Sequence, residues 1–220
     1  MRELNPVDLR LYALLDPERA NGRSLADIAR LIASDVTLVQ LRDKHGDTRR
    51  MVEQARAIRA TLKGVPLLIN DRVDVALAAG ADGVHIGQDD MSATDARRLL
   101  GPKAIIGLSL KTIEEAKAAP VQHLDYVAIG GVFVTQSKEN PKPVGLDGFA
   151  RIFAALGLHA PDLPVVAIAG IDGANAGSVI AAGADGVAVI SALSMASDPA
   201  KAAKDMRAII DAALAKRSAA

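Results

Sequence analysis

Polar and charged side chains alternate at the end of an apolar run near residue 40. In the stretch "VTLVQLRDKHG", residues 36–46, Gln40, Arg42 and Lys44 stand two positions apart. Side chains two apart on a β-strand project from the same face, so these three are expected to point together. A guanidinium and an ammonium on one face suit an anionic ligand, and we therefore expect an anion clamp at this position.

Further polar residues follow the other apolar runs, at positions where strands are expected to end. They are Asn70, Asp71, Gln88, Asp89, Asp90, Ser109, Thr135, Ser137 and Lys138, with Gly170, Ile190 and Ser191 after the last two runs. Backbone N–H groups can approach phosphate oxygens closely where glycine places no Cβ between them. Basic side chains, hydroxyls and glycine-rich turns together indicate a ligand that carries phosphate.

Carboxylates beside such an anion would repel it unless a cation lay between them. Asp71 with Asp89 or Asp90 can supply one oxygen each to Mg²⁺, while water and phosphate oxygens complete the octahedron. The residues alone leave the choice between Asp89 and Asp90 open. Together these features predict a magnesium-assisted reaction of a diphosphate with a second, phosphate-tailed substrate.

Plainer structural interpretations exist for the same residues. Arg42 and Lys44 could form an ordinary solvated pair with Asp71 or Asp90 at the rim. Asn70 or Asp71 could instead cap the helix that follows them.

Two other polar features are assigned structural roles. Ser92 followed by Asp95 predicts a capping box at a helix N-terminus. His85 lies inside a predicted strand, where a histidine satisfied within the core or at the rim is commoner than a catalyst.

The elements that must position these residues are short aliphatic runs separated by alanine-rich segments of helical periodicity. We expect strands at 11–15, 36–41, 66–69, 83–86, 104–107, 125–130, 165–169 and 186–190. Helices should begin near Leu25, Thr48, Val73, Thr94, Ile113, Leu146, Ala174 and Pro199. Alternating strands and helices predict a parallel sheet with helices outside. Eight units favour a single (β/α)8 TIM-barrel domain over residues 1–220, with its core at 11–214, and an open doubly wound sheet is the alternative.

An internal repeat supports the barrel. The sequence "AAGADGV" occurs at 78–84 and again at 181–187, as duplication of a half-barrel would leave it, although the same turn requirement met twice could also produce it. Gly80 and Gly183 are predicted to end helices. Asp82 and Asp185 are predicted to form turns before their strands, at the face opposite the functional one.

Composition limits the classes of partner. Lys plus Arg and Asp plus Glu both number 26, so no overall basic field attracts nucleic acid. There are no cysteines, which excludes disulfides and thiolate chemistry and suits a reducing cytoplasm. The start of the sequence lacks the apolar core of a signal peptide, and no run is long enough to span a membrane. Assembly into a homo-oligomer is left open.

Six blocks resemble the thiamine-phosphate synthase family in order and spacing. They are "QLRDK" (40–44), "NDRVDVALAAGADGVHIGQDD" (70–90), "IIGLS" (105–109), "DYVAIGGVFVTQSK" (125–138), "VAIAGI" (166–171) and "GVAVISA" (186–192). The resemblance extends from about Leu11 to Ala192. It implies a TIM barrel that joins hydroxymethylpyrimidine diphosphate to thiazole phosphate, yielding thiamine phosphate and diphosphate with Mg²⁺ as cofactor.

The same resemblance implies roles for individual residues. The pyrimidine diphosphate would be bound by Gln40, Arg42, Lys44, Asn70, Ser109 and Lys138, with Arg42, Lys44 and Lys138 serving catalysis at the leaving diphosphate. Mg²⁺ would be ligated by Asp71 and Asp90, and the thiazole phosphate would be held by Thr135, Ser137, Gly170, Ile190 and Ser191.

The chain departs from the family pattern at four positions. Gly131 replaces a proline, Ser137 replaces a threonine, and Ala169 replaces the first glycine of "GGI". Lys111 stands where relatives carry histidine or threonine, and the related thiazole tautomerase would use a histidine there. That tautomerase is the nearest alternative, although it needs neither the diphosphate clamp nor the metal pair. A non-catalytic barrel that binds thiazole or thiamine phosphate is the alternative from another class.

Overall fold

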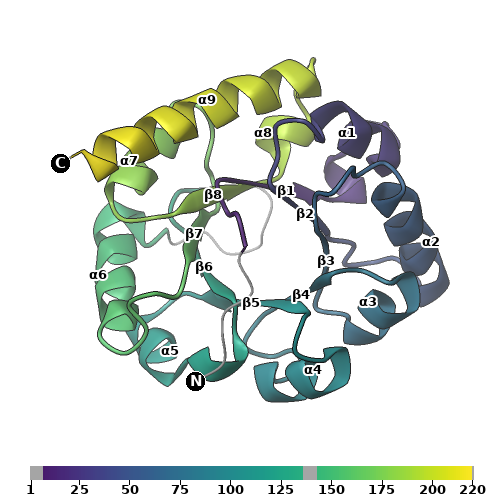
Figure 1. Cartoon of the computed structure of the whole chain (residues 1–220). Coiled ribbons are helices and arrows are strands. Elements are labelled where there is room, and N and C mark those ends of the chain that lie inside the picture. The colour runs from purple at the N-terminus through teal and green to yellow at the C-terminus, as the bar shows by residue number, and fades with distance from the viewer. Residues whose placement is uncertain (1–6, 136–142, 220) are drawn as a thin grey trace.

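Short aliphatic runs form a barrel that closes on itself. In the computed structural model, which describes residues 7–135 and 143–219, eight parallel strands are ringed by helices (Figure 1). The strands are β1 Leu11–Leu15, β2 Leu38–Leu41, β3 Leu67–Asn70, β4 Gly83–Ile86, β5 Ile105–Leu110, β6 Tyr126–Gly130, β7 Val165–Ile168 and β8 Gly186–Val189. β8 returns to pair with β1, with Leu11 opposite Val187. The predicted TIM barrel is confirmed, and the open doubly wound alternative is wrong.

The helices begin close to their predicted positions. They are α1 Leu25–Ile32, α2 Thr48–Arg59, α3 Val73–Ala79, α4 Ala93–Leu100, α5 Ile113–Ala118, α6 Gly145–Gly157, α7 Ala176–Ala181, α8 Ser191–Ser194 and α9 Pro199–Ser218, with 3-10 turns η1 Pro17–Arg19 and η2 Val121–His123. The side chains of Ser24, Asp47, Ser92, Thr112 and Asp198 each accept the backbone N–H three residues on. The predicted Ser92 cap is therefore confirmed. The short α8 and the two 3-10 turns were not predicted.

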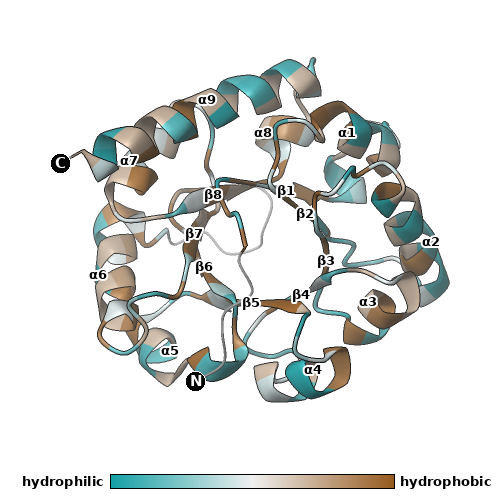
Figure 2. Cartoon of the chain, in the orientation of Figure 1, coloured by the Kyte–Doolittle hydropathy of each residue, from teal (hydrophilic) through white to brown (hydrophobic). Residues whose placement is uncertain are grey.

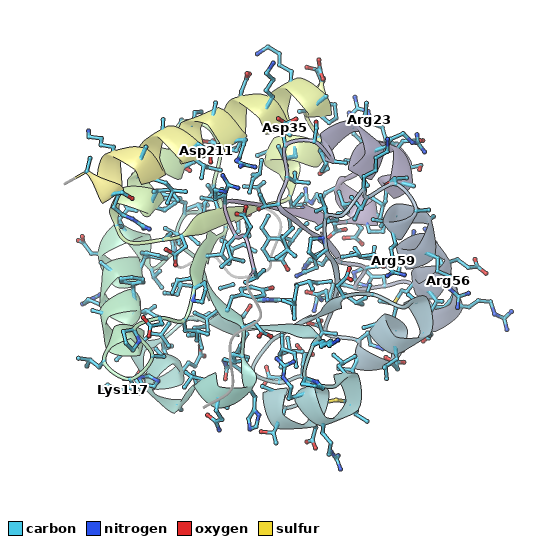
Figure 3. All side chains as sticks on the ribbon, viewed as in Figure 1. Arg23, Asp35, Arg56, Arg59, Lys117 and Asp211 are labelled. Carbon is cyan, nitrogen blue, oxygen red and sulfur yellow. The ribbon has the colours of Figure 1, made fainter. Side chains whose placement is uncertain are left out.

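Apolar residues form two layers of core. The larger cluster lies between the strands and the helices, and Figure 2 shows the strands as largely hydrophobic. The smaller cluster includes Tyr12, Leu14, Leu38, Leu68 and Tyr126 and lies inside the ring of strands. Figure 3 shows that side chains fill this ring. Because the interior is packed, a ligand is accommodated at an end of the barrel rather than through it.

Hydrogen bonds from backbone N–H groups to side chains join the strands in pairs at their amino-terminal ends. The residue just before each even-numbered strand accepts a backbone N–H from the start of the preceding odd-numbered strand. These bonds run from Leu11 to Thr37 (3.1 Å), Leu67 to Asp82 (2.8 Å), Ile106 to Asp125 (2.8 Å) and Val165 to Asp185 (2.9 Å). The structural role predicted for Asp82 and Asp185 is confirmed, and it is more specific than turn formation.

The repeated glycines adopt the backbone that was predicted for them. Gly80 ends α3 with φ of 68°, and Gly183 follows α7 with φ of 117°. Both angles lie in the left-handed region, which glycine tolerates because it has no Cβ. None of the helices in the described part of the chain has the length and hydrophobicity needed to span a bilayer.

Candidate active site

A cavity of about 450 Å³ opens where the strands end. Its lining contains all of the described residues that were expected to meet the pyrimidine diphosphate or the metal, namely Gln40, Arg42, Lys44, Asn70, Asp71, Asp90 and Ser109. Lys138 lies outside the described residues. Asn70 is the last residue of β3, and Ser109 lies within β5, which runs three residues beyond its predicted end. The predicted set thus converges on one cavity from four neighbouring strands and the loops that follow them.

Arg42 is held by a carboxylate that sequence reasoning missed. Its Nη1 forms an ion pair with Asp16 Oδ2, and the two side chains are only 11% and 4% exposed. The other oxygen of Asp16 accepts the N–H of Glu18 at 2.9 Å, so Asp16 is itself fixed. The rim pairing of Arg42 with Asp71 or Asp90 is therefore wrong. Asp16 directly follows the first strand, and that position was the available signal.

Lys44 pairs with Asp71, as the plainer interpretation expected. Lys44 Nζ contacts Asp71 Oδ2, and the carboxylate of Asp71 also meets that of Asp90. Asp90 is anchored by the N–H of Gly87 at 2.7 Å. Asp89 lines the same cavity, but Asp90 is the residue brought against Asp71.

The loop backbone directs Asp71 toward the cavity. Its φ is 63°, in a left-handed conformation that aspartate tolerates better than most residues, and its N–H donates to His85 O at 2.8 Å. Helix α3 begins at Val73 with Arg72 as its N-cap and without a side-chain capping bond. The suggestion that Asn70 or Asp71 caps this helix is therefore wrong.

Burial raises the pKa of Asp71, and the neighbouring Asp90 carboxylate raises it further, against the opposing effect of Lys44. Two hard oxygen donors in contact, with excess negative charge between them, form a suitable pair for Mg²⁺. No group of three or more potential metal-binding side chains occurs within residues 7–135 and 143–219. A two-carboxylate site still fits Mg²⁺, since this ion commonly retains water and takes phosphate oxygens as its other ligands.

The raised pKa of Asp71 predicts a pH-dependent penalty on stability. The pKa of Asp71 is lower in the unfolded chain than in the folded protein, so the unfolded state loses its proton first as the pH rises. Above this pH window the ionised carboxylate therefore lowers the free energy of unfolding. In the absence of divalent metal, Asp71→Asn should be more stable than the parent at pH 7. The difference should disappear near pH 3, where both states are protonated. Urea unfolding at the two pH values measures it, and an equal difference at both would contradict the assignment.

A second, smaller pocket of about 80 Å³ lies beside the first. It contains the described residues expected to hold the thiazole phosphate, Thr135, Gly170, Ile190 and Ser191, whereas Ser137 lies outside the described residues. Gly170 has φ of 66°, and a Cβ there would lie 2.4 Å from the carbonyl oxygen of Val134. Ile168 lines both pockets. Ligands in the two pockets would therefore meet across the end of β7.

Ala169 is one of the departures from the family pattern, and the structure shows its local consequence. Its φ is 90°, in the region that favours glycine. An alanine here retains the conformation at some cost in strain, since neighbouring structure holds it in place. The small pocket is therefore kept despite the missing glycine.

Three buried residues not predicted for the site form a hydrogen-bonded set that reaches the larger cavity at His85. Tyr12, Tyr126 and His85 are connected by hydrogen bonds, and His85 also contacts Ser109 Oγ at 2.9 Å. His85 is the satisfied histidine that was expected. The two tyrosines were missed because an aromatic residue inside an apolar run has the pattern of ordinary core.

Comparison with known proteins agrees with this geometry. The profile of the family described as thiamine monophosphate synthase matches residues 11–193. Thiamine-phosphate synthase from Agrobacterium fabrum is 56% identical over 218 residues, covering 97% of this chain and 99% of the relative. The enzyme of the same name from Albidiferax ferrireducens is 46% identical over 208 residues, covering 93% of each chain.

Solved structures give the same result. Thiamine phosphate pyrophosphorylase from Pyrococcus furiosus superposes with a TM-score of 0.82 at 35% identity, over 94% of this chain and 98% of that one. A 3-hexulose-6-phosphate synthase shares the fold, with a TM-score of 0.66 at 17% identity over 91% of this chain and 99% of that one. With a family profile that spans the barrel and relatives aligned over nearly its full length, this chain belongs to the thiamine monophosphate synthase family.

Proposed function

We propose that this chain condenses hydroxymethylpyrimidine diphosphate with thiazole phosphate and releases diphosphate. The observation that carries the proposal is the pair of adjoining pockets. One pocket holds cationic side chains beside the neighbouring carboxylates of Asp71 and Asp90, and the other places two hydroxyls and Gly170 among aliphatic side chains. The absence of cysteine suits the cytoplasm, where we place the reaction.

The chemistry needs no nucleophile from the protein. The bond between the pyrimidine methylene carbon and the diphosphate oxygen breaks, and both electrons leave with the diphosphate. The resulting positive charge spreads into the electron-rich aminopyrimidine ring, and the lone pair of the thiazole nitrogen then forms the new carbon–nitrogen bond. Arg42 and Lys44 stabilise the departing negative charge, and the adjoining pockets hold the two rings in contact.

Mg²⁺ is the cofactor that the donor set favours. Asp71 and Asp90 would hold it, with one carboxylate oxygen each. When bound, it would neutralise charge on the leaving diphosphate. Lys44 remains able to reach the diphosphate because its side chain is 44% exposed.

Asp16 is expected to act on the reaction through Arg42. Asp16→Asn keeps a side chain that can cap η1 but removes the charge that holds the guanidinium. The KM for the pyrimidine diphosphate should rise by about tenfold, with a smaller effect on kcat. Steady-state kinetics measure both. Asp27→Asn, which breaks the exposed pair with Arg30 on α1, is the matched control. An unchanged KM in Asp16→Asn would show that Arg42 needs no such support.

Diphosphate release tests the proposed function directly. We expect release only when both substrates and Mg²⁺ are present, together with formation of thiamine phosphate. Omission of each component in turn provides the controls. Interconversion of thiazole tautomers without diphosphate release would instead indicate the tautomerase, and binding of thiazole phosphate without any turnover would indicate a non-catalytic barrel.

A further inference from the structure

A continuous set of hydrogen bonds crosses the barrel interior and reaches the larger cavity at Gln40, His85 and Ser109. Gln40 Nε2 donates to the Tyr12 hydroxyl, and the hydroxyl oxygens of Tyr12 and Tyr126 are 3.0 Å apart. The Tyr126 oxygen lies 2.8 Å from His85 Nδ1, and His85 Nε2 lies 2.9 Å from Ser109 Oγ. We refer to these five residues as the interior network. Both of its ends, Gln40 and Ser109, line the cavity.

The Tyr126 ring is held in the interior network by close packing against three neighbouring residues. Gly107 faces Tyr126 in the register of β5 and β6, and a Cβ at position 107 would lie 2.1 Å from Tyr126 Cζ. The Tyr126 ring stacks on His85 with centroids 5.6 Å apart and meets Tyr12 edge-on at 5.9 Å. The missing side chain at Gly107 therefore gives Tyr126 the space that lets its hydroxyl connect the two halves of the network.

One assignment of protons lets every bond of the interior network run in the same direction, from Gln40 to Ser109. An amide NH₂ group can only donate, and each hydroxyl has one proton to give. Burial raises the pKa of both tyrosine hydroxyls, so both keep their protons. In this assignment Tyr12 accepts from Gln40 and donates to Tyr126, which in turn donates to His85 Nδ1. Because Nδ1 accepts, the imidazole proton is on Nε2 and is donated to Ser109, whose own hydroxyl proton is left for the cavity.

The two ends consequently present opposite groups to a ligand. Gln40 is 1% exposed, and its Oε1 has no hydrogen-bond partner in the part of the chain that the structure describes. A buried acceptor without a donor is unfavourable, so it marks a position where a donor on a ligand belongs. At the other end, Ser109 offers a donor. A complementary ligand carries an N–H group at one edge and a lone pair at another.

We infer that Tyr12, Tyr126 and His85 are positioning residues, which fix Gln40 as an acceptor and Ser109 as a donor. The site thereby selects a pyrimidine that bears an exocyclic amino group over the corresponding oxo compound. This inference rests on the proposed function, which supplies the pyrimidine. The amino group donates to Gln40 Oε1, and a ring nitrogen accepts from Ser109. A carbonyl oxygen in place of the amino group would face another acceptor, which a site built for hydrogen bonding rejects strongly.

The tautomer of His85 provides a test that needs no substrate. Nitrogen NMR of the unliganded parent should show the His85 proton on Nε2, with the signal assigned by its loss in His85→Gln. Gln40→Glu replaces the donor with a carboxylate that accepts from Tyr12. Every bond then reverses, and the proton should move to Nδ1, while His123 and His159 stay unchanged as internal controls. The inference is overturned if the His85 proton is on Nδ1 in the parent, or if it stays on Nε2 in Gln40→Glu.

Selectivity provides the second test. The ratio of kcat/KM for the 4-amino pyrimidine diphosphate to that for its 4-oxo analogue is compared between parent and variant, so that the intrinsic reactivities of the rings cancel. In Tyr126→Phe, Tyr12 loses its acceptor and donates to Gln40 Oε1 instead, which turns the amide NH₂ toward the ligand. The ratio should fall by about tenfold or more. An unchanged ratio in a folded Tyr126→Phe overturns the inference.

The outcomes separate the inference from the proposed function. If the parent makes no thiamine phosphate, the proposed function fails whatever the histidine tautomer is. If the parent turns over normally but the tautomer and the selectivity ratio do not respond to the two substitutions, the interior network is structural only. Thermal unfolding of each variant confirms that the comparison is made between folded proteins.

Discussion

Replacing Asp71 by alanine is expected to lower kcat by about 100- to 1,000-fold, a loss typical of removing one electrostatic contact to a developing charge. Asp71 lies in contact with Asp90 and beside Lys44, at the point where a divalent ion would meet the diphosphate. The carboxylate of Asp90 alone would bind Mg²⁺ weakly. The negative charge on the leaving diphosphate would then no longer be neutralised by the metal ion. The barrel itself should remain folded, because Asp71 lies in a loop after β3.

Two measurements separate this effect from general damage. Calorimetric titration with Mg²⁺ should show a loss of affinity in Asp71→Ala that parallels the loss of kcat. Asp89→Ala is the matched control, since it removes the same charge from the same cavity at an exposed position. Near-normal turnover by Asp71→Ala, or an equal loss in Asp89→Ala, would contradict the assignment of the metal pair to Asp71 and Asp90.

The largest expected effect on stability is at Asp125. Its carboxylate is fully buried, accepts the N–H of Ile106 at 2.8 Å and forms an ion pair with Arg97 at 2.6 Å. Asp125→Ala leaves a guanidinium that is 10% exposed without its counter-charge. Breaking a buried pair from one side costs roughly 3–5 kcal/mol of the free energy of unfolding.

Urea denaturation measures this loss. Asp205→Ala is the control, because it breaks an exposed pair with Lys201 on α9 and should hardly move the unfolding midpoint. A loss in Asp125→Ala no larger than that of the control would show that the network at the amino-terminal end of β5 and β6 contributes little.

The fold could be predicted from the sequence because its elements are defined locally. Aliphatic runs, alanine-rich helices and side-chain caps such as Ser92 each depend on neighbours within a few residues. The helix α8 was missed because "ISALS" directly continues an apolar strand without a turn residue. The end of β5 was placed too early because the aliphatic run stops at Gly107, while the backbone continues as strand to Leu110.

The candidate site was predictable only in part. Residues that follow strands converge by the geometry of a barrel, so Lys44, Asp71 and Asp90 could be grouped before the structure was known. The partner of Arg42 was missed although Asp16 directly follows β1, because a single aspartate at that position resembles an ordinary turn residue. The interior network was equally hidden. Whether Tyr126 is plain core or a hydrogen-bonding residue depends on the space left by Gly107 on the adjacent strand.

The side-chain bonds at Thr37, Asp82, Asp125 and Asp185 have a consequence for how the chain can be divided. Each bond joins an odd-numbered strand to the strand that follows it. These four side-chain bonds therefore define four two-stranded modules, which are β1–β2, β3–β4, β5–β6 and β7–β8. A backbone cut after β2, β4 or β6 leaves every module whole, whereas a cut after β1, β3, β5 or β7 separates a donor from its acceptor. Split or shuffled versions of this barrel have their natural joints between the modules.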